Sequence, residues 1–153
     1  MTIEDNLKNL NIVLPEPKPP VGAYVATKIT GKLLFVSGQI SIDKNNNLIK
    51  GKIGKELNVD QGYEAAERCA LSLISHVKKA CNGDLEKIKS CIKLTGYVNS
   101  SDNFTDQPKV INGASDMIAK ILDEKGNHSR AAVSVNSLPL GVAVEVDGIF
   151  ELN

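Results

Sequence analysis

The sequence predicts an α+β fold formed by one domain. The chain has 153 residues, which is enough for a single domain with a sizeable core. Segments in which apolar residues alternate are interspersed with two long segments in which apolar residues recur at helical spacing. Because each helical segment is apolar on one side only, we expect two helices packed on one face of a mixed sheet. The other face of the sheet would then need a partner.

We divide the chain into an N-terminal extension, residues 1–20, and a main domain, residues 21–153. In the extension, Thr2 followed three residues later by Asp5 predicts a short capped helix. The proline-rich segment Leu14–Pro20 cannot continue that helix, because proline fixes φ and lacks an amide hydrogen. We expect this segment to be an extended connector that lies on the domain.

Two strands are expected at the start of the domain, over Tyr24–Ile29 and Leu33–Ile42. The short segment between them contains Gly31, which is typical of a hairpin connection. A polar turn and an irregular loop with Gly51 and Gly54 then lead to the first long helix.

The first long helix is predicted over Asp60–Ala80. Asp60 suits the N-cap, basic residues in the last turn suit the helix dipole, and Gly83 follows as a stop. The apolar stripe consists of Tyr63, Ala66, Ala70, Leu73, Ile74 and Val77. Ile88–Val98 then reads as a strand.

The second long helix is predicted over Asp106–Lys125, with Asp106 as its cap and Pro108 in its first turn. Gly126 ends it. Gly113 costs a helix about 1 kcal/mol relative to alanine. We therefore expect this glycine to allow close packing of the helix on the sheet.

The stretch Ser129–Asp147 contains two alternating apolar runs that flank a turn built on Pro139 and Gly141, so it reads as two strands. Arg130 opens the first run, and Glu145 lies in the second on the opposite parity to the valines. If the two runs pair, or lie in neighbouring strands of one sheet, the guanidinium and the carboxylate can lie near the same face.

The two charged residue types suggest a chemistry. Arginine binds a carboxylate or phosphate through two parallel hydrogen bonds, and a nearby glutamate can orient or deprotonate a water molecule. The pair therefore indicates a site that holds a small acid and delivers water to it. The alternative is an ordinary surface ion pair, worth about 0–1 kcal/mol.

From Arg130 to Val146 the sequence reads R-x-x-V-x-V-x-x-L-P-x-G-x-x-V-E-V, which resembles the C-terminal signature of the YjgF/RidA family. Gly22–Val25 followed by Leu34–Ile40 is similar to the family's N-terminal signature, a G-P-Y motif and then a strand ending in S-G-Q. The two blocks have the order and separation found in the family. The resemblance extends from about Pro20 to Leu152.

The resemblance implies a chorismate-mutase-like fold and a homotrimer with the sheets inward and the active sites between protomers. Members of the family are enamine/imine deaminases, also named endoribonuclease L-PSP. The implied activity is hydrolysis of reactive intermediates such as 2-aminoacrylate and 2-iminopropionate to a 2-keto acid and ammonia. The small-molecule partner would be an imino acid or 2-keto acid, and neither a metal nor an organic cofactor is needed.

The resemblance also implies roles for individual residues. Arg130 matches the arginine that clamps the substrate carboxylate, and Glu145 matches the glutamate that positions the attacking water. Tyr24 matches a tyrosine that lines the pocket from the neighbouring protomer, the alternative being a strand aromatic packed on its neighbours. Ser37 matches a serine that could hold water or substrate, although strand serines often bond the backbone instead. Gly38 would let a ligand or another chain approach the backbone closely.

The chain also departs from the family pattern. Ala132 stands where many relatives have a cysteine, so thiol chemistry is excluded there, although its backbone amide could still bind a carboxylate. Ala23 replaces the proline before the tyrosine. His128 is unusual for the family and is either an acid/base group in the pocket or a loop histidine in solvent. These departures bear on the identity of the substrate more than on the fold.

Composition excludes several classes of function. The 18 basic residues balance the 18 acidic ones, which argues against a nucleic-acid or membrane-surface binder. Cys69, Cys81 and Cys91 lack the spacing of a zinc site or a disulfide framework, so we expect buried reduced thiols and a cytoplasmic protein. We expect no signal peptide and no membrane span, because the first residues lack a continuous apolar run.

Two rival functions remain open. One is a non-catalytic trimer that binds a small metabolite and regulates a partner, in which Arg130 would matter and Glu145 would not matter for turnover. The other is a ribonuclease. A ribonuclease usually needs paired acid/base groups and a basic track for phosphates, whereas this chain has His76 and His128 as its only histidines and no net charge.

Overall fold

A five-stranded sheet with the strand order β1-β2-β5-β3-β4 forms the centre of the fold. The computed structural model describes residues 1–153. The strands are β1 (Thr27–Thr30), β2 (Leu33–Ile40), β3 (Ile88–Asn99), β4 (Ser129–Val135) and β5 (Val144–Leu152). β3 and β4 pair in parallel and the other neighbours are antiparallel, which confirms the predicted mixed sheet.

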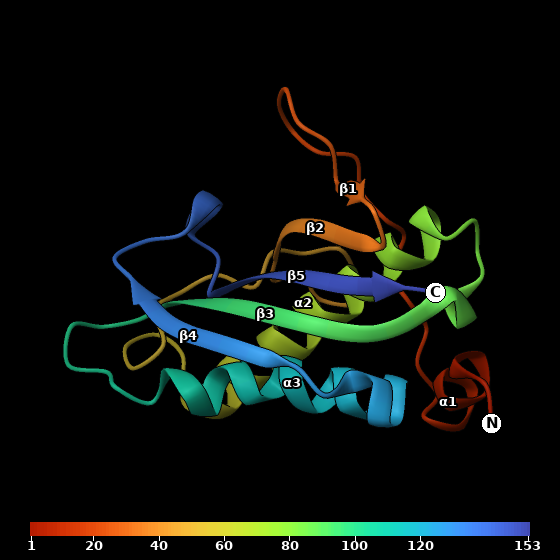
Figure 1. Cartoon of the computed structure of the whole chain (residues 1–153). Coiled ribbons are helices and arrows are strands. Elements are labelled where there is room, and N and C mark those ends of the chain that lie inside the picture. The colour runs from red at the N-terminus through yellow and green to blue at the C-terminus, as the bar shows by residue number, and fades with distance from the viewer.

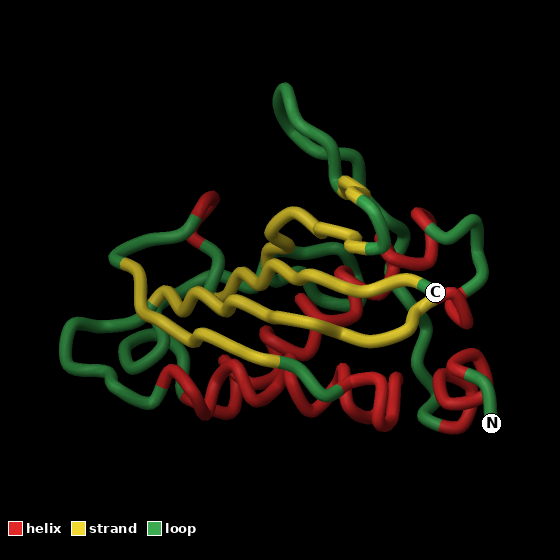
Figure 2. The backbone as a smooth tube through the Cα atoms, viewed as in Figure 1, coloured by secondary structure: helices red, strands yellow, loops and turns green.

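Two long helices, α2 (Val59–Ala80) and α3 (Gln107–Leu122), lie side by side on one side of this sheet (Figures 1 and 2). The predicted arrangement of two helices on one face is therefore confirmed. None of the helices combines the length and the apolar composition needed to cross a membrane.

We call the covered side the helix face and the opposite side the bare face. Side chains alternate between the two sides along each strand. The helix face carries fully buried residues, among them Leu34, Leu94, Val144, Val146 and Phe150. The bare face carries their neighbours in sequence, among them Phe35, Tyr97, Glu145, Asp147 and Ile149, which remain partly or largely accessible.

The helix boundaries differ slightly from those predicted. The N-cap of α2 is Asn58, not Asp60, because the side chains of Asn58 and Gln61 bond each other's backbone amides in a capping box. Gly83, with φ of +88°, ends the helix as predicted, and its N–H donates to the carbonyl of Lys78 at 2.8 Å. α3 ends at Leu122, and the residues expected to continue it form a 3₁₀ turn, Asp123–Gly126.

The strand predicted from Tyr24 begins instead at Thr27. The residues before it form bends, and Figure 1 shows this segment standing away from the rest of the molecule. β1 and β2 form the predicted hairpin, with Gly31 at φ +57° in the turn. Tyr24 therefore lies on a projecting arm, residues 21–26, and not in the sheet.

The N-terminal helix α1 (Ile3–Asn9) has the predicted capping box between Thr2 and Asp5. Its Ile3 and Leu7 are buried in the same core cluster as the sheet and the long helices. The amide of Asn6 donates to the carbonyl of Ile121 at 2.9 Å, at the C-terminal end of α3. The expected extension thus shares the core of the domain.

α2 and α3 cross at close range where both helices carry glycine. A Cβ added to Gly113 would lie 2.0 Å from the carbonyl oxygen of Tyr63 in α2, and a Cβ on Gly62 would lie 3.1 Å from the side chain of Val110 in α3. The prediction that Gly113 packs closely on the sheet is therefore wrong. It packs on the other helix, because the backbones of the two helices approach each other there.

We predict that Gly113→Ala destabilises the protein. Helix propensity alone would favour alanine by about 1 kcal/mol. The added methyl group would meet backbone atoms, which cannot rotate away, and overpacking typically costs about 1–3 kcal/mol or more. The net free energy of unfolding should therefore fall, as measured by urea denaturation. Lys120→Ala, on the exposed side of α3, serves as the control and should change it by less than about 0.5 kcal/mol. A more stable Gly113→Ala variant would contradict the close crossing.

Candidate active site

The strands that carry Arg130 and Glu145 are not neighbours, because β3 lies between β4 and β5. Arg130 is in register with Leu94, whose side chain lies in the core on the helix face. Glu145 is in register with Tyr97 on the bare face. Leu94 and Tyr97 are an odd number of positions apart, so the two charged side chains project to opposite faces. The expectation that they share a face is wrong for the single chain.

Arg130 lies over α3 and is held only by neutral groups. Its Nη1 donates to Asn112 Oδ1 at 2.9 Å and to Ser115 Oγ at 3.1 Å, and its Nη2 contacts the carbonyl of Pro108 at 3.5 Å. These three residues recur at helical spacing, so they share one face of α3. All four ion pairs in the structure use lysines, so Arg130 has no carboxylate partner and the surface-ion-pair alternative is not realised.

The guanidinium presents one free edge. Its Nε has no hydrogen-bond partner in the chain, and Nη2 makes only the long contact to Pro108. Together Nε and Nη2 form a planar pair of donors that fits the two oxygens of a carboxylate. Arg130 can therefore bind a carboxylate side-on without giving up its bonds to Asn112 and Ser115.

His128 is neither an acid/base group at the free edge of Arg130 nor a solvent-exposed loop residue. The ring is half-buried behind Ser115, and both its nitrogens have partners. Nε2 lies 2.9 Å from Ser115 Oγ, and Nδ1 lies 2.6 Å from the carbonyl oxygen of Gly126. Sequence reasoning missed Asn112 and Ser115. The signal for them was their helical spacing after Pro108, on a helix that packs against the strand of Arg130.

Glu145 is half-buried on the bare face. Its backbone is paired in the sheet, but its carboxylate makes no hydrogen bond within the chain. Its carboxylate lies over Gly38, where an added Cβ would lie 2.7 Å from Oε1. Gly38 falls at an irregularity of β2 between Val36 and Gln39. In the single chain, the absence of a side chain at Gly38 therefore lets the Glu145 carboxylate approach the backbone of β2.

Ser37, next to Gly38, bonds the backbone of the projecting arm. Its Oγ donates to the carbonyl of Val25 at 2.8 Å, and its N–H donates to the carbonyl of Ala26 at 2.9 Å. The hydroxyl hydrogen is thus occupied, while the lone pairs of Oγ remain able to accept from a water or a ligand. Ser37 anchors the base of the arm to β2.

Asp147 is a second carboxylate beside Glu145 on the bare face. Burial, and then the charge of Asp147, raise the pKa of Glu145 above its ordinary value. Burial also raises the pKa of Asp147, against the opposing effect of hydrogen bonds from Tyr97 and Thr95. The hydroxyl of Tyr97 donates to Asp147 Oδ2 at 3.2 Å. Tyr97 and Asp147 were not among the expected site residues, although Glu145 and Asp147 two positions apart on one strand had to share a face.

The structure therefore brings together only part of the expected site. Gly38 lies against the Glu145 carboxylate on the bare face, and Ser37 precedes Gly38 in β2, with its hydroxyl bonded to the arm. Arg130 and Ala132 lie at the β4 edge on the helix face, with Ala132 packed against the core. Tyr24, 53% exposed, lies on the arm next to β1 at the opposite edge of the sheet (Figure 1).

A comparison with models of protein families shows to which family the chain belongs. Residues 4–152 match the model of the family described as "YjgF/chorismate mutase-like, putative endoribonuclease". The chain belongs to the YjgF/RidA family. This membership confirms the resemblance seen in the two signature blocks, and the matched range also includes nearly all of α1.

Individual relatives in the family match the chain over nearly its whole length. Protein TCP17 of Trypanosoma cruzi is 44% identical over 149 residues, covering 97% of this chain and 92% of its own. A structure of an Agrobacterium tumefaciens protein of unknown function is 43% identical with a TM-score of 0.91, covering 99% of this chain and 94% of its own. A Shewanella oneidensis structure described as a putative endoribonuclease is 33% identical with a TM-score of 0.95, covering 99% and 100%.

The bare face of this YjgF/RidA chain is apolar around its two carboxylates. Phe35 is 40% exposed and Val133 is 44% exposed, and the projecting arm adds Val21 and Val25. Apolar side chains gathered around polar groups on an uncovered sheet face are typical of a surface that binds another chain.

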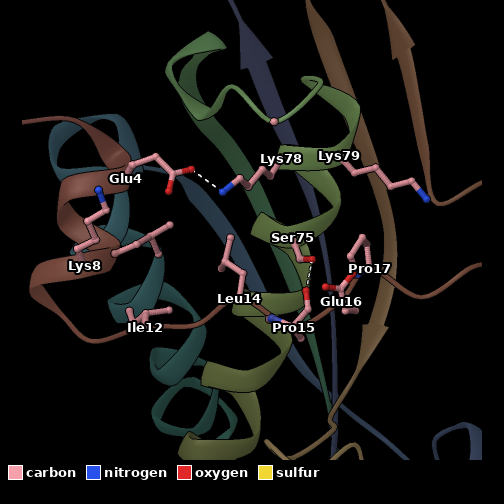
Figure 3. A pocket seen from close by; sticks show the side chains of 12 residues that line it. Glu4, Lys8, Ile12, Leu14, Pro15, Glu16, Pro17, Ser75, Lys78 and Lys79 are labelled. Atoms are coloured by element: carbon pink, nitrogen blue, oxygen red, sulfur yellow. Dashed lines mark hydrogen bonds and ion pairs between the residues drawn. The ribbon is translucent and has the colours of Figure 1, made fainter.

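The structure also contains a cavity of about 410 Å³ away from these residues. Figure 3 shows that side chains from α1, the proline-rich connector and α2 surround it. Lys78 and Glu4 form an ion pair of 2.6 Å across it, and Ser75 bonds the carbonyl of Pro15. Neither Arg130 nor Glu145 lines this cavity, which lies between the N-terminal segment and α2. No group of three or more His, Cys, Asp or Glu side chains is placed to hold a metal ion.

We predict that Asp147→Asn lowers the pKa of Glu145. The neighbouring negative charge opposes ionisation of Glu145, so neutralising it should keep the carboxylate ionised to lower pH. Asparagine can still accept from Tyr97, which preserves the local packing. The measurement is an NMR titration of the ¹³C-labelled Glu145 carboxyl. Asp116→Asn, on α3, is the control and should leave this pKa unchanged. An unchanged pKa in Asp147→Asn would contradict the coupling of the two carboxylates.

Proposed function

We propose that the protein hydrolyses reactive enamine and imine intermediates, such as 2-aminoacrylate and 2-iminopropionate, to a 2-keto acid and ammonia. The single observation that carries the proposal is Arg130, a guanidinium held by three neutral acceptors with one planar edge free and no carboxylate partner in the chain. An anion that completes this arrangement would be the substrate carboxylate. Membership of the YjgF/RidA family supports the same reading.

We propose further that the active site forms between copies of the chain in a homotrimer. In one copy Arg130 and Glu145 lie on opposite faces of the sheet, so they can act on one small molecule if they come from two copies. The apolar bare face supplies a surface for such an assembly. The arm that carries Tyr24 stands away from the rest of its own chain (Figure 1), which supports a role for Tyr24 in lining a neighbour's pocket.

In the proposed reaction, Arg130 binds the substrate carboxylate through Nε and Nη2. Glu145 orients a water molecule and accepts one of its protons as the oxygen adds to the carbon of the protonated imine, which gives a neutral carbinolamine. Glu145 then passes that proton to the amine. As the C–N bond breaks and ammonia leaves, Glu145 takes the proton of the hydroxyl group, the carbonyl forms, and the proton passes to solvent. Orientation and fixed charges lower the barrier, and no step requires a metal or an organic cofactor.

The raised pKa of Glu145 suits this role. A carboxylate with a pKa above its usual range is a stronger base than an exposed one. Its lack of a hydrogen-bond partner in the chain leaves it free to bind water.

The structure gives a ribonuclease little support. His76 is buried in α2, and burial lowers its pKa, while both ring nitrogens of His128 are occupied. The two histidines therefore do not form an acid/base pair. A non-catalytic trimer that binds a metabolite remains the second candidate, since it would use the same arginine.

We also infer that the protein works in a reducing compartment, the cytoplasm. Cys69, Cys81 and Cys91 are all free and buried. Burial raises the pKa of each thiol, for Cys91 to about 12, which favours unreactive reduced cysteines.

We predict that both charged residues are needed for turnover. The assay generates 2-aminoacrylate from serine with a dehydratase and follows pyruvate formation. Glu145→Gln should lower the rate about 100-fold or more, because general base catalysis typically contributes 10²–10⁴-fold. Arg130→Lys keeps the charge but loses the fork, so it should mainly raise KM. Arg68→Lys alters the only other arginine and is the matched control.

The outcomes of this assay separate the candidates. Acceleration by the wild type that Glu145→Gln loses, and that Arg130→Lys shows only at higher substrate concentration, supports imine hydrolysis. A wild type that forms trimers and binds 2-keto acids, yet does not accelerate pyruvate formation, favours the metabolite-binding alternative or a different imine.

We predict that Gly38→Ala reduces activity without unfolding the protein. The added methyl group would displace the Glu145 carboxylate, which is the flexible end of a side chain and can move at low energetic cost. The value of kcat should fall at least tenfold, while the thermal unfolding temperature changes little. Gly31→Ala, at the hairpin turn with open space around it, is strained by the φ of +57° and should lower the unfolding temperature while keeping full activity, so it separates loss of stability from loss of catalysis. Full activity in Gly38→Ala would contradict the role of the Glu145 position.

A further inference from the structure

Behind Arg130, a line of hydrogen bonds runs through Ser115 and His128 to the backbone of Gly126. Arg130 Nη1 lies 3.1 Å from Ser115 Oγ, Ser115 Oγ lies 2.9 Å from His128 Nε2, and His128 Nδ1 lies 2.6 Å from the Gly126 carbonyl oxygen. The line joins β4, α3 and the segment that connects them. Neither Ser115 nor His128 is part of the signature blocks of the family.

The partners at the two ends fix the direction of two bonds in this line. The Gly126 carbonyl can only accept, so Nδ1–H of His128 donates to it. Arg130 can only donate, so Ser115 Oγ accepts from it. In the neutral imidazole with its proton on Nδ1, Nε2 is an acceptor for the hydroxyl hydrogen of Ser115.

The far end of the line is held rigidly. A Cβ on Gly126 would lie 2.9 Å from the Ile118 carbonyl oxygen and from the Cα of Ala119, so this glycine packs directly on α3. Ser115 lies on the same helix, whose opposite side is buried in the core. The carbonyl that orients His128 and the helix that carries Ser115 are therefore fixed relative to each other.

We propose that Ser115 and His128 are positioning residues that restrict the plane of the Arg130 guanidinium and so hold its free edge ready for the substrate carboxylate. This inference rests on the proposed function. With Nη1 held from behind, Nε and Nη2 present two donors in a restricted direction, and the carboxylate that they bind takes up a restricted plane.

Loss of the line should weaken carboxylate binding, because Nη1 would keep only its bond to Asn112, and the ligand itself would have to order the less restricted guanidinium. Pyruvate, the 2-keto acid product, serves as the probe. Ser115→Ala and His128→Ala should each raise the Kd of pyruvate about tenfold, the size expected for one hydrogen bond to a charged group. Ser115→Thr keeps the hydroxyl, and His128→Gln offers an acceptor to it, so both should recover most of the affinity.

The two histidines allow a direct test of the coupling. His128 should show the ¹⁵N NMR pattern of the Nδ1-protonated tautomer, and its ring signals should shift when pyruvate is added. His76, buried in α2 and outside the line, is the internal reference and should not respond. In Ser115→Ala, the response of His128 to pyruvate should be lost, although the ring is unchanged. A purely structural role for Ser115 would lower the melting temperature but leave this response.

Arg130→Ala distinguishes a failure of this inference from a failure of the proposed function. If Arg130→Ala binds pyruvate as the wild type does, the proposed site is wrong. If Arg130→Ala loses binding while Ser115→Ala and His128→Ala bind normally, the proposed site stands and the positioning role is refuted. Should His128→Ala fail to fold, the comparison of Ser115→Ala with Ser115→Thr decides the inference, and equal affinities in those two would overturn it.

Discussion

The two long helices cover only one face of the sheet, and this constraint determines on which face Arg130 and Glu145 lie. Side chains alternate across a strand, so burial of Val144, Val146 and Phe150 against the helices forces Glu145 and Asp147 to the opposite side. The same alternation places Arg130 on the helix face through its register with Leu94. Moving β5 by one residue would bury its carboxylates in the core, and moving β4 by one residue would turn Arg130 to the bare face.

The charges of the candidate site are left without compensation in a single chain. Arg130 has three neutral acceptors and no carboxylate, and Glu145 is half-buried with no donor and a negative neighbour in Asp147. A burial that raises the pKa of a carboxyl opposes folding once that group is ionised, so the arrangement does not serve stability. Groups kept in costly environments are typical of sites where a ligand or a partner supplies the missing charge.

Local features of the fold could be predicted from sequence, whereas long-range ones could not. Both long helices, the α1 capping box and the end of α2 at Gly83 depend on residues within a few positions, and these predictions hold. The N-cap of α2 was misplaced although Asn58 and Gln61 were visible, because Asp60 also suits a cap. The insertion of β3 between β4 and β5 depends on pairing across the chain, which no local pattern encodes. The predicted proximity of Arg130 and Glu145 was wrong because β3 separates their strands. The assignment of Gly113 to the sheet was wrong because the contact between α2 and α3 is also long-range.

The setting of Arg130 shows how a packed core can give a polar site its precision. On one side of α3, Ile111, Ala114 and Ile118 are fully buried, and this packing fixes the rotation of the helix. The adjacent side of the same helix then presents Asn112 and Ser115 to the guanidinium at distances set by the core. Glu145 depends in the same way on the missing side chain of Gly38. Arg130 is thus aimed by rigid secondary structure and Glu145 by a glycine contact, and in the function that we propose the carboxylate of an imino acid makes the bond that the chain itself leaves unmade.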